Sequence, residues 1–316
     1  MVLSYWPPDT YVLTGRGFIK IFDIVPYDLV AVTDGFSTWF ESPATLARAS
    51  SRRISDKLVR KTACEQLFGC FPGENRILMG VGIGESRYQP LFIEVGKATS
   101  SQLSRIYNSF DLKFGSESIL SPIHRFMVAT QADGSVRCRD SDGKYVVTFS
   151  FAKDRKADRL ERICWELEKF GAEYTMDTTD VFRFRVVCPF ECHKRFRQWV
   201  NLSNKSKAWL GGFLKEVQEW DSHIIDNHAF SFSTNCTDDL DIVQAAAVLC
   251  GYRTRVSLQK TSGVYSLLCR SNGQFNGMGL LNSGAKFSHE EWAAIITSTP
   301  YAGIIFRSNH IVFAGM

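Results

Sequence analysis

The chain has 316 residues, of which 45% are hydrophobic and 22% charged, as in an ordinary globular protein with one large or two modest domains. It contains no run of about 18 apolar residues and no basic start followed by an apolar core, so we expect no membrane span and no secretory signal. Nine scattered cysteines favour reduced thiols in a cytoplasmic setting, and a net charge of +4 only mildly favours a polyanionic partner.

The chain divides into three parts by its sequence pattern. Residues 1–117 are predicted to be mostly β, because DTYVLTGRGFIKIFDIVPYDLVAVTDG has short apolar stretches separated by Gly, Pro and Asp. Residues 118–272 alternate predicted helices with hairpins. Residues 273–316 begin rich in Gly and Asn and end in the strand-like IIFRSNHIVFAG. We therefore predict an α+β protein.

The middle part is internally duplicated. A helix follows each of the two Phe-Ser-Phe segments, 149–151 and 230–232, and each helix is predicted to end at a glycine, Gly171 or Gly251. A strand pair follows each glycine. Residues at helical spacing form an apolar face in each helix, with Asp154 and Thr237 as candidate N-caps: Leu160, Ile163, Cys164, Leu167 and Phe170 in the first, and Leu240, Val243, Ala247 and Cys250 in the second.

An apolar helix that ends in aspartate precedes each Phe-Ser-Phe segment. FMVATQADG ends at Asp133 and FLKEVQEWDS at Asp221, so one unit is used twice, in about 118–200 and 201–272. Duplicated halves can pack about a pseudo-twofold axis, which would bring the two carboxylates together. Close carboxylates repel unless cations neutralise them, so both are candidate ligands for Mg²⁺, with Mn²⁺ as the alternative. One Asp-Gly alone would indicate only a turn, but the matched pair favours phosphodiester hydrolysis.

Arginines stand two residues apart in three predicted strands. Residues i and i+2 of a strand point to the same face, so in a curved sheet these pairs would form a basic surface for double-stranded DNA. The simpler alternative is a set of solvated arginines on amphipathic strands. The candidate DNA-binding arginines are Arg137, Arg139, Arg183, Arg185, Arg253, Arg255 and Arg270.

One cysteine cluster raises the possibility of a structural zinc site. Cys188, Cys192 and His193 lie in CPFECH, but such a site needs four ligands, usually as two spaced pairs. The other close pair, Cys64 and Cys70, has unsuitable spacing. A partly buried strand end is therefore the favoured interpretation.

The duplicated part resembles the LAGLIDADG homing endonucleases, in the two-repeat form found in inteins of phages and bacteria. FMVATQADG resembles the first motif and FLKEVQEWDS the second, and HKRFRQWVNLS and FSTNCTDDLDIVQAAAVLCGYRTRV match in consistent order. The resemblance implies the order αββαββα used twice, with saddle-shaped sheets. It also implies a monomeric, site-specific double-strand DNA endonuclease with a long target, in the cytoplasm of a bacterial or phage-infected cell. In that family Asp133 and Asp221 would be the metal-binding catalytic aspartates.

The same resemblance assigns further residues. Lys194 matches a lysine placed near the active site, and Lys153 and Lys260 would contact DNA. The second motif departs from the family pattern at Ser222, which stands where a glycine is usual. Glu216 stands where a small residue permits close helix crossing. Because serine tolerates a helix-end conformation less well than glycine, we expect weaker cleavage by the Asp221 half.

The flanks resemble the Hint splicing module of inteins. DTYVLTGRGFIKIFDIVPYDLVAVTDG looks like its opening block and YAGIIFRSNHIVFAG like its closing strands, so the endonuclease would be an insertion in a mostly β domain. Ser4 aligns with the splicing nucleophile. No histidine precedes His124, so the Thr-x-x-His pair is missing there, and Met316 stands where a terminal Asn is required. We expect a relic that does not splice. A DNA-binding descendant that no longer cleaves and an active self-splicing intein remain the alternatives.

Overall fold

The computed structural model describes residues 6, 8, 10–50, 58–61, 70–72, 76–82, 88–94, 106–107, 112, 115–152, 157–177, 181–259, 261–271, 275–276, 280–281, 291–296, 298, 303–305, 307 and 312–314. Within these ranges lie four α-helices and several sheets whose strands pair antiparallel, so the predicted α+β class is confirmed. No helix in the described part is long and apolar enough to cross a membrane.

The first repeat is a four-stranded antiparallel sheet covered by two helices. Its strand order is β11-β12-β14-β13. In chain order its elements are α2 (Pro122–Asp133), β11 (Gly134–Cys138), β12 (Tyr145–Ala152), α3 (Ala157–Phe170), β13 (Glu173–Asp177) and β14 (Val181–Cys188).

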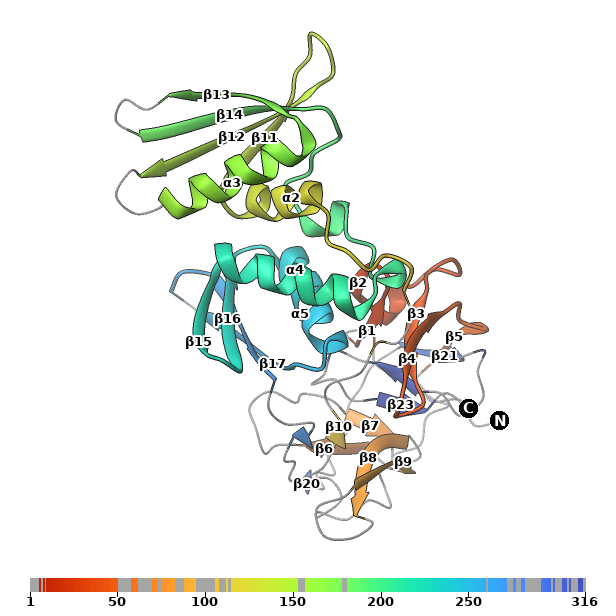
Figure 1. The fold of residues 1–316 in the computed structure, drawn as a ribbon. Coiled ribbons are helices and arrows are strands. Elements are labelled where there is room, and N and C mark those ends of the chain that lie inside the picture. The colour runs from red at the N-terminus through yellow and green to blue at the C-terminus, as the bar shows by residue number, and fades with distance from the viewer. Residues whose placement is uncertain are drawn as a thin grey trace.

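The second repeat has the same topology, because its strand order is β15-β16-β18-β17. Its elements are α4 (Lys207–Trp220), β15 (Ser222–Asp226), β16 (Ala229–Thr234), α5 (Thr237–Leu249), β17 (Arg253–Gln259) and β18 (Val264–Arg270). The two repeats meet where α2 packs against α4, and in Figure 1 the first repeat stands above the second.

Local signals explain where these helices begin and end. Ser121 and Ser206 cap α2 and α4 by accepting hydrogen bonds from backbone N–H groups. Gly171 and Gly251 follow α3 and α5 with φ of 65° and 88°, the left-handed conformation that glycine adopts easily. The expected cap Thr237 is wrong, since it is the first residue of α5 and Cys236 precedes it without a side-chain capping bond. Asp154 lies outside the described residues.

The expected third helix is absent from the described residues that follow β14. Instead the chain forms two short 3-10 turns, η4 (Phe196–Gln198) and η5 (Leu202–Asn204). Asn201 accepts a hydrogen bond from the Ser203 backbone N–H at 3.2 Å, and such local side-chain bonds compete with a continuous helix. Most of the stretch after β18, where the second copy of that helix was expected, lies outside the described residues.

Strands from both ends of the chain build the remaining part together. Its largest sheet has the order β19-β10-β8-β23-β22-β3-β1-β2, in which strands before and after the two repeats are neighbours. The N-terminal strands are β1 (Tyr11–Thr14), β2 (Gly17–Lys20), β3 (Val30–Thr33), β4 (Thr38–Glu41), β5 (Thr45–Ser50), β6 (Leu58–Lys61), β7 (Cys70–Pro72), β8 (Arg76–Gly82), β9 (Tyr88–Glu94) and β10 (Ile106–Tyr107). The C-terminal strands are β19 (Phe275–Asn276), β20 (Leu280–Leu281), β21 (Glu291–Ile296), β22 (Gly303–Ile305) and β23 (Val312–Ala314).

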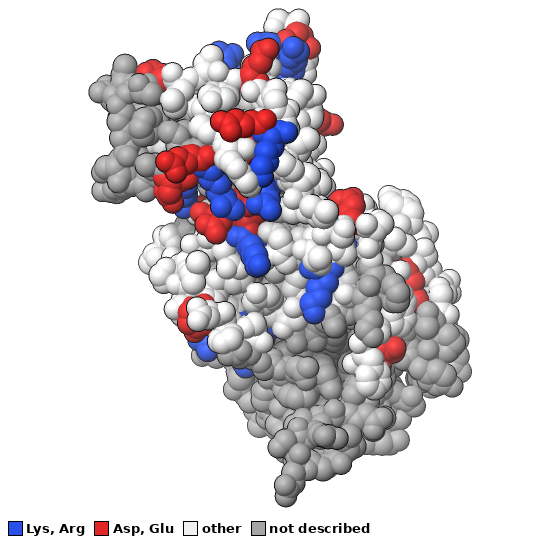
Figure 2. All heavy atoms as spheres, viewed as in Figure 1, with Lys and Arg blue, Asp and Glu red and all other residues white. Residues whose placement is uncertain are grey.

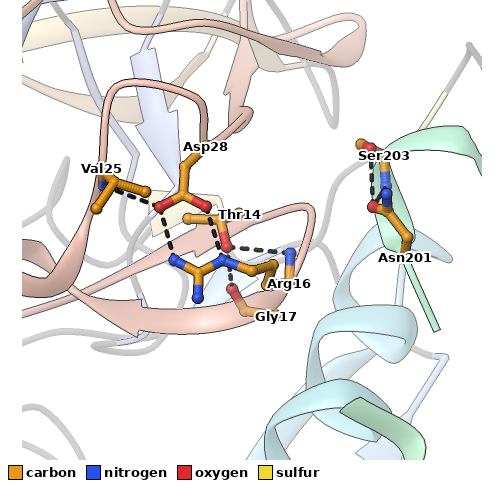
Figure 3. A network of polar contacts seen from close by, with 7 residues as sticks. All are labelled: Thr14, Arg16, Gly17, Val25, Asp28, Asn201 and Ser203. Carbon is orange, nitrogen blue, oxygen red and sulfur yellow. Dashed lines mark hydrogen bonds and ion pairs between the residues drawn. The ribbon is translucent and has the colours of Figure 1, made fainter. Parts of the chain in front are cut away.

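The turn between β1 and β2 docks this β part onto the second repeat. Figure 3 shows the turn stiffened by Arg16, whose guanidinium donates two hydrogen bonds of 2.7 Å to the Asp28 carboxylate. The Leu202 backbone N–H donates to the Gly15 carbonyl at 2.7 Å. A Cβ at Gly15 would lie 2.9 Å from Asn201 Oδ1, so a larger residue would require the Asn201 side chain to shift. The β part and the second repeat are therefore closely packed here.

Candidate functional site

The C-terminal ends of α2 and α4 carry the two predicted aspartates. Asp133 is the last residue of α2, and Asp221 is the C-cap residue of α4. Arg159 of α3 contacts both ends, whereas Lys194, from the chain after β14, contacts the end of α2. Because one arginine side chain reaches both, the C-terminal ends of the two packed helices lie near each other.

Arg159 contacts both helix ends. It lies in the first turn of α3, and its Nη1 is 2.5 Å from Asp133 Oδ2. Its Nη2 donates to the backbone carbonyl of Trp220, the residue before Asp221. Its guanidinium also lies over the Trp220 ring, 5.5 Å from the centroid. Sequence analysis missed Arg159, because one arginine in a helix with several charged residues carries no distinguishing pattern.

Lys194 lies against the end of α2. Its Nζ donates to the backbone carbonyls of Thr130 at 3.0 Å and Gln131 at 2.5 Å. Burial lowers the pKa of Lys194 from its ordinary value, and the charge of Arg195 lowers it further. Three carboxylates act in the opposite direction: those of Asp221, Asp239 and Asp133. Lys194 therefore lies within electrostatic reach of both predicted catalytic aspartates.

Asp239 is a further carboxylate near the end of α2, and it was not predicted. It lies in the first turn of α5 and is 0% exposed. Its Oδ2 accepts hydrogen bonds of 3.0 Å from Gln131 Nε2 and Arg195 Nη1, and its Oδ1 accepts from the Phe196 backbone N–H at 2.9 Å. These donors satisfy the buried charge, as burial of a carboxylate requires.

Gly134 follows Asp133, whereas Ser222 follows Asp221. Glycine is needed after Asp133 because of limited space and not because of its backbone conformation. Gly134 has an ordinary φ of −85°, so its backbone conformation does not require glycine. A Cβ there would instead lie 2.8 Å from the Thr130 Cα. Ser222 begins β15, and its hydroxyl donates to the Val217 carbonyl at 3.2 Å. Serine is therefore accommodated at the end of α4, and the predicted backbone strain is absent from this described position.

Glu216 lies in the seam between the repeats and is 2% exposed. Arg162 of α3 donates to its two oxygens at 2.8 and 2.6 Å, and the Trp220 indole donates to Oε1 at 2.9 Å. A carboxylate in place of a small residue is thus compensated by an arginine from the other repeat. A Cβ on Gly212 of α4 would lie 3.3 Å from the Leu120 side chain, which is a tight contact.

The outer face of the first sheet carries three of the predicted arginines. Arg183 and Arg185 of β14 are exposed, and they alternate with the buried Phe184 and Val186. Arg137 of β11 is also exposed. Arg137 pairs with Val146 of β12, and Val146 pairs with Val187 of β14. Because Val187 stands two residues after Arg185, Arg137 lies on the same face as Arg183 and Arg185. This pattern matches the prediction for these three residues.

Arg139 does not join this surface, which corrects the sequence prediction. β11 ends at Cys138, and Arg139 opens the turn to β12. Its guanidinium forms an ion pair with the Asp142 carboxylate. The hydrogen bond from Arg139 lowers the pKa of Asp142 to about 2. Its charge is thus used within the turn.

The outer face of the second sheet also carries three arginines. Arg253 and Arg255 of β17 are exposed on either side of Thr254, which is buried. Arg270 of β18 is exposed and lies directly opposite Arg253 in the antiparallel register. Like charges that face each other across a strand pair repel, so an anion bound between them would be stabilising. Arg183 and Arg185 thus share one face of the first sheet, and Arg253 and Arg255 share one face of the second, as the period of two in a strand predicts.

Other predicted site residues lie outside the described part of the chain. These are Ser4, Lys153 and Lys260. Within the described residues no group of three or more His, Cys, Asp or Glu side chains is placed to hold a metal. Asp133 and Asp221 supply hard carboxylate oxygens of the kind that Mg²⁺ and Mn²⁺ prefer, so a divalent ion between the helix ends would need water or phosphate as further ligands.

The face with α3 and α4 is not a candidate nucleic-acid surface. Figure 2 shows acidic and basic side chains interleaved over it, with no large area of one sign. The ion pair between Arg162 and Glu216 links the same two helices. The outer faces of the two sheets are therefore the better candidates for a polyanion.

Comparison with known proteins gives one curated match. No protein-family model matches the chain. The ribonucleoside-diphosphate reductase subunit beta of Aquifex aeolicus (strain VF5) is 26% identical over 286 residues, which cover 79% of this chain and 40% of that protein. The chain thus spans about two fifths of the length of this relative.

Similar solved structures include proteins with LAGLIDADG domains. A structure of I-DmoI in complex with DNA and Mn is 14% identical and covers 48% of this chain and 90% of that one, with a TM-score of 0.35. The N-terminal LAGLIDADG domain of DUF199/WhiA is 9% identical and covers 50% and 80%, with a TM-score of 0.34. Both TM-scores are low, so these likenesses do not indicate the function of this chain. Its function is inferred from its own residues.

Proposed function

We propose that the chain is a metal-dependent, site-specific double-strand DNA endonuclease. The observation that carries this proposal is the junction of the two repeats, where Asp133 and the end of the Asp221 helix are joined by one arginine. Lys194 lies within electrostatic reach of both carboxylates. Two acids and two cations at the meeting point of duplicated halves suit a reaction in which two phosphodiester bonds are cut.

Asp133 and Asp221 are the residues that would hold Mg²⁺ or Mn²⁺. A bound divalent ion would supply an activated water and stabilise the leaving oxygen of a phosphodiester. Lys194 is held at the end of α2 by two backbone carbonyls, so its ammonium is positioned to stabilise negative charge on the phosphate. In this proposal the chain's own residues bind the metal and fix the reacting phosphate.

The substrate surface in this proposal is formed by the outer faces of the two sheets. Arginine is suited to phosphates and to the guanine edge in the major groove because its guanidinium donates in a planar fork. The opposed pair Arg253 and Arg270 supports this surface, since a phosphate between them would relieve their repulsion. Both repeats belong to one chain, so we propose that a monomer binds the duplex.

The coverage of the curated match supports an inserted element. The matched 79% of the chain exceeds the residues 118–272 alone, so part of the β-rich flanks is matched as well. Only 40% of the relative is involved, as expected if an element of this kind is inserted in a longer protein. We propose an intein-type element with a Hint-like β part, in a bacterial or phage-infected cytoplasm. Its target would be the uninterrupted gene of a host protein such as a reductase subunit.

The first test is cleavage by the purified full chain. A plasmid carrying the uninterrupted reductase gene, and a plasmid library with random inserts, are incubated with Mg²⁺ or Mn²⁺. We expect a linear product, and we expect Asp133→Asn and Asp221→Asn to lower its rate by on the order of 10²-fold or more. Both variants should still bind the cleaved sequence. No cleavage of either substrate, or full activity of Asp133→Asn, would contradict the proposal.

A DNA-binding descendant without nuclease activity is the second candidate. It is favoured by the ion pair that already neutralises Asp133 through Arg159. Sequence-specific binding in a footprinting experiment, with no nick in either strand at any metal concentration, would establish this candidate. Self-splicing stays third, and ligated flanks after expression inside a host protein would establish it.

A further inference from the structure

The first turns of α3 and α5 occupy equivalent places in the two repeats. Arg159 stands twelve residues before Gly171, and Asp239 stands twelve residues before Gly251. Both glycines follow their helices with positive φ. Arg159 and Asp239 are therefore counterparts that carry opposite charge.

Each counterpart reaches the first helix of the other repeat. Arg159 of the first repeat donates to the Trp220 carbonyl at the end of α4. Asp239 of the second repeat accepts from the Gln131 side chain near the end of α2 at 3.0 Å. The two contacts cross the seam in opposite directions, as the pseudo-twofold relation requires. They are equivalent in position and different in chemistry.

Only one of the two counterparts can donate to a carboxylate. Arg159 also binds Asp133, the aspartate of its own repeat, at 2.5 Å. Asp239 cannot act in this way on Asp221, because a carboxylate accepts hydrogen bonds and carries the same charge. The orientation of Asp133 thus depends on a guanidinium for which the second repeat has no counterpart at the equivalent position.

We propose that Arg159 is a positioning residue for Asp133, and that its loss slows the cut made by the Asp133 half much more than the cut made by the Asp221 half. The inference rests on the proposed endonuclease function. A carboxylate that binds a metal is commonly oriented by a hydrogen bond from a neighbouring residue. Misplacement of a reacting group by about 1 Å can cost on the order of 10²-fold in rate. Unequal cutting would appear as nicked DNA.

The experiment measures the cleavage of each strand separately. A duplex with the sequence cut by the wild-type chain carries a different fluorophore on each strand, and single-turnover rates are measured with Mg²⁺. We expect Arg159→Met to slow one strand on the order of 10²-fold, with an accumulating nick, while the other strand is slowed much less. Arg159→Lys keeps the charge and should restore part of the slowed rate. DNA affinity without metal should stay close to that of wild type.

A matched control separates positioning from loss of stability. Arg162 lies one turn further along α3 and binds Glu216 in the seam, away from Asp133. Arg162→Gln should lower thermal stability and leave the ratio of the two strand rates unchanged. Asp133→Asn provides the reference for the affected strand, which should be the one slowed in Arg159→Met.

A spectroscopic measurement tests whether Arg159 instead only competes with the metal. Tb³⁺ bound by Asp221 would lie close to Trp220, so excitation of the indole should sensitise its luminescence. Competition alone predicts that Arg159→Met binds Tb³⁺ at a lower concentration than wild type and cuts both strands at least as fast, because a positive charge beside Asp133 is lost. That result, or both strands slowed in the wild-type ratio, would overturn this inference. A wild-type chain that cuts no DNA would instead refute the proposed function.

Discussion

The buried carboxylate of Glu166, in the seam between the helices, destabilises the folded protein. Glu166 of α3 is 2% exposed, and neither of its oxygens accepts a hydrogen bond within the described part of the chain. Nη1 of Arg125 in α2 lies 3.7 Å from Glu166 Oε1. Burial raises the pKa of Glu166 from its ordinary value, and the Glu216 charge adds to this against the nearby cations. The charged form of Glu166 is therefore unfavourable in the folded protein.

Replacing Glu166 by Gln should raise stability near neutral pH. A buried acceptor without a partner costs on the order of 1 kcal/mol or more, and glutamine lowers that cost by removing the charge. Because the folded pKa is raised, the wild-type protein gains stability as the pH falls through that pKa and loses it as the pH rises. Urea unfolding at several pH values should show the largest benefit of Glu166→Gln at neutral pH and little benefit in acid.

At the scale of elements, α5 shows how packing overrides a local pattern. Its sequence predicted one apolar face, but every residue from 239 to 249 is buried. The sheet of the second repeat contacts α5, and so does β2. A Cβ on Gly17 of β2 would lie only 3.0 Å from the Ile242 side chain. The helix therefore also buries Asp241, which needs cations from two other segments.

Arg307 links the C-terminal β part to α5. Its Nη2 lies 2.6 Å from Asp241 Oδ1, and its Nε donates to Gln244 at 3.1 Å. Its guanidinium also lies over the rings of Tyr11 and Phe18. Burial raises the pKa of Asp241 to about 6, although Arg307 and Arg197 act to lower it. This arginine therefore connects both ends of the chain to the second repeat.

The variant Arg307→Met should destabilise the protein in a pH-dependent way. At pH 8 Asp241 is ionised, and we expect a loss of roughly 2 kcal/mol, below the roughly 3–5 kcal/mol of a fully unpaired buried charge because Arg197 remains. Near pH 5 Asp241 is largely protonated in the folded protein, so the loss should be smaller. Equal losses in thermal or urea unfolding at the two pH values would contradict this explanation.

At the scale of the whole molecule, the two sheets present arginines on outer faces that no helix in the described part of the chain covers (Figure 1). Arg137, Arg183 and Arg185 lie on the first sheet, and Arg253 and Arg270 face each other on the second. A duplex bound across both faces would release counterions from its phosphates, so the affinity should fall as salt concentration rises.

The salt dependence of DNA affinity should distinguish the arginines on the sheet faces from Arg139, which pairs within a turn. Replacing Arg185, Arg253 or Arg270 by Ala should reduce the slope of log affinity against log salt by about one where the residue contacts a phosphate. Arg139→Ala is the matched control and should leave the slope unchanged, because Arg139 pairs with Asp142. Fluorescence anisotropy over a range of salt provides the measurement. If Arg139→Ala reduced the slope as much as the other variants do, the proposal that the sheet faces bind DNA would lose its support.

Some features of this protein are determined by short stretches of sequence. The duplicated order of elements, the helices that end at Asp133 and Asp221, and the glycines that stop α3 and α5 all follow from local periodicity and backbone preference. The exposure of alternating arginines follows from the period of two in a strand. The exception, Arg139, arose from a turn that began one residue earlier than the pattern indicated.

Other features were decided only by tertiary packing. Arg159 meets Trp220 across 61 residues of chain, Gln131 meets Asp239 across 108, and Arg307 meets Gln244 across 63. Contacts between such distant residues leave no periodic trace in the sequence, because each partner alone looks like an ordinary polar residue on a helix or turn. The sequence therefore located the two aspartates, whereas the residues that hold them in place depend on how the repeats fold against each other and against the β part.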